Sequence, residues 1–212
     1  MSLPKPTAIL FDLDGTLVDS IADLTVAANY ARAQLQMPPL DEATIRGYVG
    51  DGAWRLLERA VGAQADLTRA FADFRSYYRD HCVEQSSVYP HVEETLEALG
   101  ELPMAVVSNK PQAFTEQVVA GLGLAQYFRV VVGARKGIPV KPDPALLRLA
   151  CAELDVDPSE CWMVGDSPND FHAARSVGAA SVLVEYGLTD VPLLEALEPD
   201  ALIGDFAALL SL

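Results

Sequence analysis

The sequence predicts an α/β protein in which a parallel β-sheet forms the core and a block of helices is inserted after the first strand. Two observations predict the sheet. Short apolar runs recur along the chain, and segments with a helical pattern lie between most of these runs. A third predicts the insert, because residues 20–84 contain helical patterns without a strand. With 212 residues, the chain is long enough to bury a sizeable core.

Each expected strand is a short apolar run that ends at polar or turn residues, a pattern typical of strands buried on both faces. In chain order these runs are Ala8–Phe11, Met104–Val107, Val130–Val132, Trp162–Val164, Ala180–Val184 and Ala201–Ile203. The helical patterns between them are His91–Leu99, Gln112–Leu122, Pro144–Leu154 and Asn169–Val177. Strands that alternate with helices of this length indicate a parallel sheet with helices on both faces.

The helical insert lies between the first and second expected strands. Its expected helices are residues 20–37, 41–48, 53–61 and 66–84. We therefore expect a core of residues 1–18 and 86–212 and a helical cap domain of residues 19–85. The expected hinges are Val18–Ser20 and Ser86–Pro90. An insert at this position would cover the loop after the first strand, whereas the alternative is an ordinary helical layer at the side of the sheet.

Composition limits the classes of partner. The net charge of −15 at pH 7 argues against a nucleic-acid partner, which requires a basic surface. No apolar stretch approaches the ~20 residues that a bilayer requires, so we expect no membrane partner. Cys82, Cys151 and Cys161 lack a CxxC or metal-ligand spacing and are typical of buried thiols. We expect a cytoplasmic protein that is a monomer or a homodimer.

The first expected strand ends in two carboxylates, Asp12 and Asp14. Because side chains alternate along a strand, both point to the same side. Carboxylates this close repel, so they need a cation, a shared proton or hydrogen bonds. An EF-hand loop is unlike this sequence, because its sixth and twelfth positions would be Leu17 and Asp23 instead of Gly and Glu. The remaining alternative is an Asp-Gly turn before a capped helix.

Two later segments carry further polar groups. Ser108 and Asn109 follow the second expected strand and could hold phosphate oxygens, although Ser-Asn before Pro is also a common helix start. Lys110 lies in the same segment. Lys141 is fixed between turn residues and can offer a compact charge to a carboxylate and a phosphoryl group. The alternative for Lys141 is a surface position at the start of a helix.

The fourth expected strand also ends in carboxylates. Asp166 lies at its end, and Asp170 lies in the first turn of the next helix. Together with Asp12 and Asp14 they make an oxygen-rich set suited to a hard cation such as Mg²⁺. The alternative is that Ser167 or Asp170 only caps the helix. Strand ends of a parallel sheet meet at one edge, where open α/β sheets carry their chemistry.

These motifs, in this order, resemble those of the haloacid dehalogenase superfamily, specifically its phosphatases with a helical (C1-type) cap inserted after the first motif. The matching segments are Asp-Leu-Asp-Gly-Thr-Leu, the Ser108 loop, Lys141 and Gly-Asp-Ser-x-x-Asp. The resemblance implies a Rossmann-like core. Tyr48–Ala53, Ser108–Pro111, Lys141–Pro144 and Tyr186-Gly187 are similar to phosphoglycolate phosphatases. Family dehalogenases lack an acid at the position of Asp14.

The resemblance implies hydrolysis of a small phosphomonoester through an aspartyl-phosphate. Asp12 would attack phosphorus, and Asp14 would protonate the leaving alkoxide and then accept a proton from water. Lys141 and Ser108 would stabilise the phosphoryl oxygens. Thr16 and Asn109 would make supporting contacts. The resemblance also implies Mg²⁺, held by Asp12, the Asp14 carbonyl and Asp166, with Asp170 as a further ligand, directly or through water.

The cap is expected to choose the substrate. Gly50, Asp51 and Gly52 match the cap loop that faces the site in relatives, and Arg46 or Arg55 could pair with a substrate carboxylate. The alternative for each arginine is a solvated helix face. The implied substrate is 2-phosphoglycolate. Sugar phosphates, N-acetylmuramic acid 6-phosphate and nucleotide monophosphates stay open, a phosphomutase is disfavoured, and a different class would be a non-catalytic binding protein of the same fold.

Overall fold

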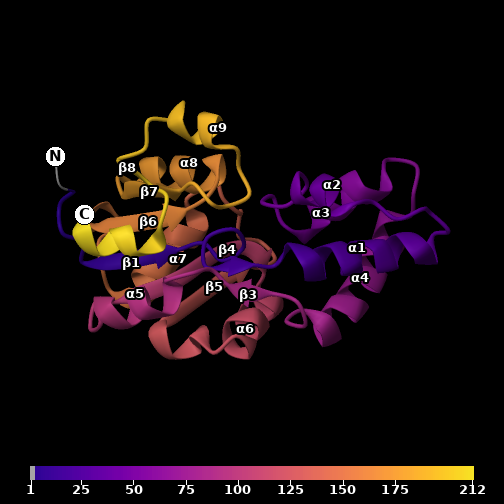
Figure 1. Ribbon diagram of the computed structural model, residues 1–212, viewed down its shortest axis with the longest axis horizontal. Coiled ribbons are helices and arrows are strands. Elements are labelled where there is room, and N and C mark those ends of the chain that lie inside the picture. Colours follow the sequence, from indigo (N-terminus) through magenta and orange to yellow (C-terminus); the bar gives the residue numbers. More distant parts are fainter. Residues whose placement is uncertain (1–2) are drawn as a thin grey trace.

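The computed structural model describes residues 3–212 and has a six-stranded parallel sheet at its centre (Figure 1). The strands are β1 (Ala8–Phe11), β4 (Met104–Pro111), β5 (Val130–Ala134), β6 (Cys161–Gly165), β7 (Ala180–Val184) and β8 (Ala201–Ile203). Their order across the sheet is β5-β4-β1-β6-β7-β8. All six apolar runs predicted as strands lie in this sheet, which confirms the α/β fold class.

The central strand β1 lies between β4 and β6. Phe11, its last residue, pairs with Val106 of β4 and Val164 of β6. All these strands are parallel, so their carboxyl ends reach the same edge of the sheet at the same level. This register places the polar segments that follow β1, β4 and β6 side by side.

Helices cover both faces of the sheet. They are α5 (Val92–Leu99), α6 (Gln112–Gly121), α7 (Ala145–Leu154), α8 (Pro168–Val177) and α9 (Val191–Glu195), with short 3₁₀ turns η1 (Leu124–Tyr127), η2 (Pro158–Glu160) and η3 (Phe206–Ser211). Alternate residues of β1 enter opposite cores: Ile9 and Phe11 pack in one apolar cluster, and Ala8 and Leu10 pack in another with α7 and α8. The continuous apolar run of β1 therefore reflects burial on both faces.

The insert forms four helices beside the sheet, drawn in indigo and purple in Figure 1. They are α1 (Ile21–Gln34), α2 (Glu42–Arg46), α3 (Ala53–Val61) and α4 (Leu67–His81), and α1 packs against each of the other three. Asp23 in the first turn of α1 accepts hydrogen bonds from the main-chain N–H groups of Gln85 and Ser86, at 2.8–3.1 Å. This carboxylate ties the two ends of the insert together.

The two segments expected to be hinges are paired with each other. β2 (Val18–Asp19) and β3 (Ser87–Val88) form a separate antiparallel pair in which Val18 is opposite Val88. The sequence did not predict this pair, because two-residue strands are too short to show an alternating pattern. The insert is thus joined to the core by two hydrogen-bonded strands, while the division into core and cap domains stays a prediction.

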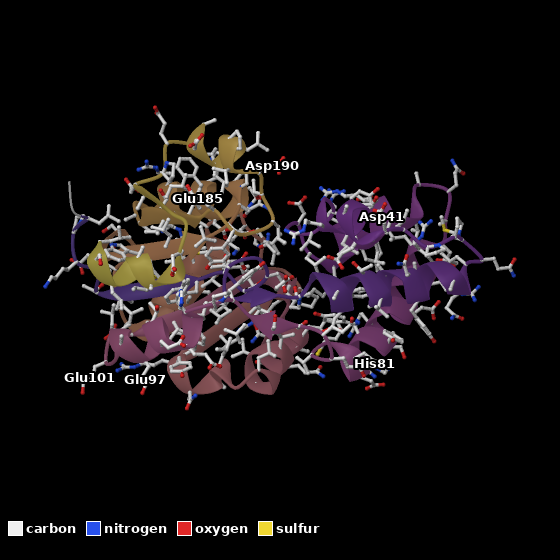
Figure 2. All side chains as sticks on the ribbon, in the orientation of Figure 1. Asp41, His81, Glu97, Glu101, Glu185 and Asp190 are labelled. Atoms are coloured by element: carbon white, nitrogen blue, oxygen red, sulfur yellow. The ribbon has the colours of Figure 1, made fainter. Side chains whose placement is uncertain are left out.

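Acidic side chains are spread over the outside of the molecule (Figure 2). Asp41, Glu97, Glu185 and Asp190 are examples of exposed carboxylates. By contrast, both Lys110 and Lys141 are buried. Across residues 3–212, no helix is both long and apolar enough to span a membrane. Cys82, Cys151 and Cys161 are buried free thiols.

Candidate active site

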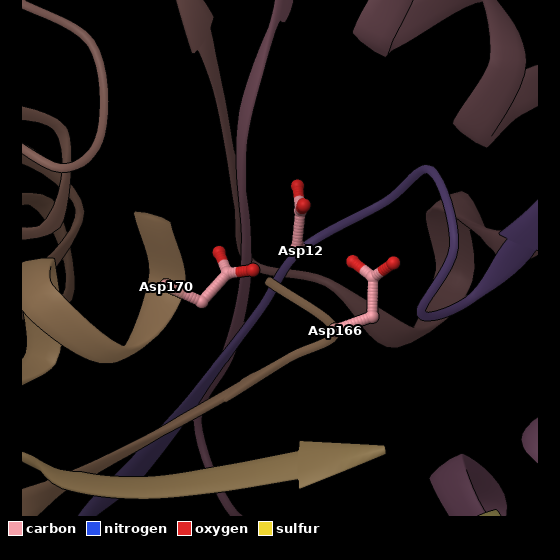
Figure 3. Close-up of side chains that lie close together, drawn as sticks. All are labelled: Asp12, Asp166 and Asp170. Carbon is pink, nitrogen blue, oxygen red and sulfur yellow. The ribbon is translucent and has the colours of Figure 1, made fainter. Parts of the chain in front are cut away.

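The ends of β1 and β6 and the first turn of α8 bring three carboxylates together. Asp12 follows β1, Asp166 follows β6, and Asp170 lies in the first turn of α8. One oxygen from each lies within 4.8 Å of the others, and Figure 3 shows the three side chains grouped around one point. All three are buried, and Asp170 is 0% exposed. This acidic triad is the one that the sequence predicted, except that the carboxylate of Asp14 is not part of it.

Burial and mutual repulsion disfavour negative charge in the acidic triad. Burial raises the pKa of Asp12 to about 6; Lys141 opposes this shift, and the carboxylates of Asp170 and Asp14 add to it. Burial also raises the pKa of Asp166 well above its usual range, with further contributions from Asp170 and Asp12. A cation in this place would relieve both effects.

Lys141 supplies the ammonium group for the acidic triad. It comes from the loop between β5 and α7, and its Nζ lies 2.7 Å from Asp170 Oδ1, 3.0 Å from Asp12 Oδ1 and 2.6 Å from the Val107 carbonyl. These three acceptors match the three N–H groups of the ammonium. Burial lowers the pKa of Lys141, but Asp12 and Asp170 outweigh burial and hold it above its ordinary value. Lys141 is therefore not a surface lysine.

Asn109 in β4 fixes the main chain at Lys141. Its side-chain carbonyl accepts from Lys141 N at 2.8 Å, and its amide donates to Lys141 O at 2.8 Å. The same amide lies 2.9 Å from the Gly50 carbonyl of the insert. Asn109 thus joins three segments that are distant in sequence.

The helix-cap alternative for Ser167 and Asp170 is also correct. Ser167 and Asp170 form a capping box at the start of α8, and Ser167 Oγ donates to Asp170 Oδ2 at 2.6 Å. The other oxygen of Asp170 binds Lys141. Asp166 is held by the Leu188 N–H at 2.7 Å and contacts the Thr16 hydroxyl at 3.4 Å. The structure therefore places Thr16 against Asp166, as a support for a triad carboxylate.

The carboxylate of Asp14 is not one of the three in the acidic triad and binds a second lysine. Both of its oxygens lie 2.7 Å from Lys110 Nζ, and Ser20 Oγ donates to Oδ1 at 2.5 Å. Because Lys110 and Ser20 hold the carboxylate of Asp14, the metal contact predicted for Asp14 is the one through its main-chain carbonyl, and it stays a prediction. The sequence suggested no role for Lys110 and suggested Ser20 only as a helix cap, although the Ser20 side chain makes no cap hydrogen bond. Lys110 stood in a segment that was already suspected, but the direction of its side chain depends on the irregular end of β4.

A cavity of about 40 Å³ lies between the insert and the core. Asp12, Asp14, Ser108 and Lys110 line its core side. Leu24, Leu56, Phe74 and Tyr78 line the opposite side and come from α1, α3 and α4. Two carboxylates, a hydroxyl and an ammonium therefore face a space that is otherwise mainly apolar.

The insert loop Gly50–Gly52 rests on the core at the cavity. The Asn169 amide donates to Asp51 Oδ1 at 2.9 Å, and Asp51 also pairs with Arg59. Gly52 has a φ of 85°, and a Cβ atom there would lie 3.0 Å from the Asn109 carbonyl oxygen. A side chain at this position would therefore disturb the contact between loop and core.

The two predicted arginines lie elsewhere. Arg46 Nη1 donates to the Gly187 carbonyl at 3.1 Å, and Arg55 pairs with Glu58 at 2.6 Å with its side chain 62% exposed. Neither is among the residues that line the cavity. The structure therefore brings the predicted loop to the site, gives Arg46 a contact between insert and core, and leaves Arg55 on the surface.

Comparisons with known proteins agree with this geometry. Residues 9–184 match the model of a family described as haloacid dehalogenase-like hydrolase. A phosphoglycolate phosphatase of Chromobacterium violaceum is 40% identical over 205 residues, covering 92% of each chain. The plasmid phosphoglycolate phosphatase of Cupriavidus necator is 41% identical over 216 residues, covering 99% of this chain and 93% of the relative. The crystal structure of a predicted phosphoglycolate phosphatase from Haemophilus somnus has a TM-score of 0.91 at 32% identity and covers 99% of both chains.

Proposed function

The chain belongs to the haloacid dehalogenase-like hydrolase family and is a phosphatase, and we propose that it hydrolyses 2-phosphoglycolate through an aspartyl-phosphate. The names of its relatives at about 40% identity support this substrate. The observation that carries the proposal is the cavity, which Asp12 and Asp14 both line, with a buried lysine bound to each carboxylate. Sugar phosphates and N-acetylmuramic acid 6-phosphate are the competing substrates.

Asp12 is the proposed nucleophile. The Leu13 N–H at 2.7 Å and Lys141 at 3.0 Å both hold its Oδ1. We assign the other oxygen, Oδ2, to attack phosphorus, so that a P–O bond forms as the bond to the leaving oxygen breaks. Lys141 and the Ser108 hydroxyl then stabilise charge on the phosphoryl oxygens.

Asp14 is the proposed acid and base. Lys110 and Ser20 fix its carboxyl group, and Asp14 lines the same cavity as Asp12. Asp14 gives its proton to the departing alkoxide oxygen, which leaves as an alcohol. It then takes a proton from the water that attacks the aspartyl-phosphate, which releases phosphate and restores both carboxyl groups.

Mg²⁺ is the metal that we propose for the acidic triad. The donor set fits, because Asp12, Asp166 and Asp170 are buried oxygen ligands and, within the part of the chain that the structure describes, Lys141 is their only ion-pair partner. The main-chain carbonyl of Asp14 is a further proposed ligand. When bound, the cation neutralises carboxylate and phosphate charge.

Residues 19–85 are the proposed cap, which closes over the bound substrate and excludes water. The contacts of Asn109 with Gly50 and of Asn169 with Asp51 support this role, because they join the insert to the core beside the cavity. A reaction that forms an aspartyl-phosphate benefits from a closed site, since water can then enter only for the second step.

A panel of small phosphomonoesters tests the proposed function. We expect 2-phosphoglycolate to have the highest kcat/KM, with sugar phosphates and nucleotide monophosphates far behind. Removal of divalent ions by a chelator should abolish turnover and Mg²⁺ should restore it, while Ca²⁺ should inhibit because its coordination is larger and looser. Full activity after exhaustive chelation would contradict the metal assignment, and a clear preference for a sugar phosphate would contradict the substrate.

A further inference from the structure

Two polar groups on the leaving-group side of the cavity, Lys110 Nζ and the Tyr78 hydroxyl, lack a full set of partners. We propose that they bind the carboxylate of the substrate's leaving group, so that this pair, and not an arginine of the cap, selects an acidic substrate. The proposal rests on the proposed function and names the groups that would make the site specific for 2-phosphoglycolate.

Lys110 has a hydrogen bond to spare. Its ammonium has three N–H groups, and in residues 3–212 its hydrogen-bond acceptors are the two oxygens of one carboxylate, Asp14. Lys141 shows what a buried lysine in this chain can hold, because it contacts Asp12, Asp170 and the Val107 carbonyl at once. The Lys110 ammonium, which already donates to Asp14, can therefore also donate to a second carboxylate.

Tyr78 brings a buried hydroxyl to the same place from the other side of the cavity. It lies on α4, is 1% exposed and lines the cavity. Its hydroxyl has no hydrogen-bond partner among the described residues. Its ring is fixed by stacking on Phe74 at 5.3 Å and by an edge contact with Phe114 at 5.1 Å. A buried hydroxyl that is held rigidly at the cavity without a partner in the chain is available to a ligand there.

The two groups lie close together. Lys110 Nζ is 5.1 Å from the centre of the Tyr78 ring. Burial lowers the pKa of Lys110, but Asp14 and, after it, Tyr78 outweigh burial and hold the pKa above its ordinary value. A cation and a hydroxyl that converge on one cavity match the two oxygens of a carboxylate.

The position of Lys110 fits the length of glycolate. Asp14 is the group that would protonate the ester oxygen, and Lys110 is in direct contact with Asp14. In 2-phosphoglycolate a single methylene separates the ester oxygen from the carboxylate. A carboxylate so close to the ester oxygen would lie beside the Lys110 ammonium, which binds Asp14.

The rest of the cavity wall disfavours larger polar leaving groups. Leu24, Leu56, Phe74 and Phe114 are buried apolar side chains that line it. A sugar would bury several hydroxyls against these side chains without partners, which is costly. Arg46 and Arg55 do not line the cavity, and their contacts are with Gly187 and Glu58. Charge and shape therefore both favour a short acid.

The test compares two phosphate esters of the same shape. Isobutyl phosphate has two methyl groups where 2-phosphoglycolate has the two carboxylate oxygens. The variant is Tyr78→Phe, which removes only the hydroxyl. The matched control is Tyr77→Phe, the same change one residue earlier on α4, where the ring stacks on Tyr30 at 4.6 Å and does not line the cavity.

We expect Tyr78→Phe to lower kcat/KM for 2-phosphoglycolate roughly tenfold and to lower kcat/KM for isobutyl phosphate much less. Its melting temperature should stay the same or rise, because the lost hydroxyl has no partner in the free protein. Tyr77→Phe should change neither ester. Lys110→Met should reduce the preference for the acid still further, although it also lowers turnover of both esters through Asp14.

The outcomes separate this proposal from the proposed function. If the wild type prefers 2-phosphoglycolate and both Tyr78→Phe and Lys110→Met keep the full preference, the Lys110–Tyr78 assignment is overturned while the function stands. If the wild type hydrolyses both esters equally well, the acidic substrate itself is wrong, and this proposal fails with it. Equal losses on both esters in Tyr78→Phe would show a structural role and would also overturn the assignment.

Discussion

The site contains two buried lysines with different surroundings. All three partners of Lys141 belong to the core, namely Asp12, Asp170 and the Val107 carbonyl, and they satisfy its ammonium completely. The hydrogen-bond acceptors of Lys110 within residues 3–212 are the two oxygens of Asp14, and Lys110 lines a cavity whose other wall belongs to the helical insert. The saturated lysine lies where the phosphoryl group would react, and the unsaturated lysine lies where the leaving group would sit.

This difference divides the site into two halves. The reacting half surrounds Lys141 and would carry out the reaction, and the selecting half surrounds Lys110 and would choose the substrate. The reacting half rests on the register of β1, β4 and β6, which a change of substrate would not alter. The selecting half includes Tyr78 of α4 and therefore depends on how the insert packs on the core. Variants in the two halves should differ in whether their effect depends on the ester used.

Lys141→Met should have the largest effect. Without the ammonium, Asp12 and Asp170 lose their counter-charge and Asp12 loses a contact that holds it in place, so turnover should fall about a thousandfold or more on every ester. The turnover of Lys110→Met should fall much less on isobutyl phosphate than on 2-phosphoglycolate. Steady-state kinetics with saturating Mg²⁺ measures both variants. If the loss of turnover depended on the ester to the same extent in both variants, the distinction between the two halves would be wrong.

Asp14→Asn should have the next largest effect, and its loss of turnover should depend on the leaving group. Alkyl esters need a proton on the departing oxygen, so their turnover should fall roughly a hundredfold or more. The leaving group of 4-nitrophenyl phosphate departs as a stable phenolate, so the loss of turnover on this ester should be several-fold smaller. Rates for both esters in the variant and in the wild type give the comparison. Identical losses would argue against an acid role for Asp14.

Gly52→Ala should lower kcat/KM for 2-phosphoglycolate by about tenfold. The new methyl group would lie 3.0 Å from the Asn109 carbonyl at a φ of 85°, which strains the loop and its contact with the core. The matched control is Gly62→Ala, because Gly62 has a φ of 76° and open space around it. The control should lose stability without losing specificity. A similar kinetic loss in both variants would point to general strain in the insert.

Asp12→Asn should raise the melting temperature of the metal-free protein at pH 7.5 by about 2–4 °C, equivalent to roughly 1 kcal/mol. The pKa of Asp12 is about 6, above its usual 3.8, so the folded chain binds a proton more tightly than the unfolded chain. The stability from that proton is present below pH ~4 and is lost as the pH rises through about 6. The gain should therefore vanish near pH 4. A gain that is the same at both pH values would contradict the raised pKa.

The sequence predicted the parts of the site that follow from strand geometry. Asp12 and Asp166 end apolar runs, and parallel strands in register bring such ends together. Lys141 was also predicted, because the turn residues beside it suggested a fixed position. The motifs and the family resemblance together were enough for the reacting half.

The selecting half could not be predicted in the same way. Tyr78 lies in an amphipathic helix, where a buried aromatic residue is indistinguishable from an ordinary core residue until its hydroxyl is located. Lys110 follows an irregular strand end, so its direction is not set by alternation. Arg46 and Arg55 looked suitable by charge, but their directions depend on how α2 and α3 pack. The paired segments Val18–Asp19 and Ser87–Val88 were too short to recognise.

The proposed mechanism requires that Asp12 is phosphorylated during turnover. The most direct measurement is acid quenching of the protein during steady-state hydrolysis of 2-phosphoglycolate with Mg²⁺, followed by mass spectrometry of its peptides. We expect one phosphoryl group on the peptide that contains Asp12, and we expect it to disappear on treatment with hydroxylamine and to be absent from Asp12→Asn. Rapid turnover without any phosphorylated protein, or a phosphoryl group on another residue, would contradict the proposed mechanism.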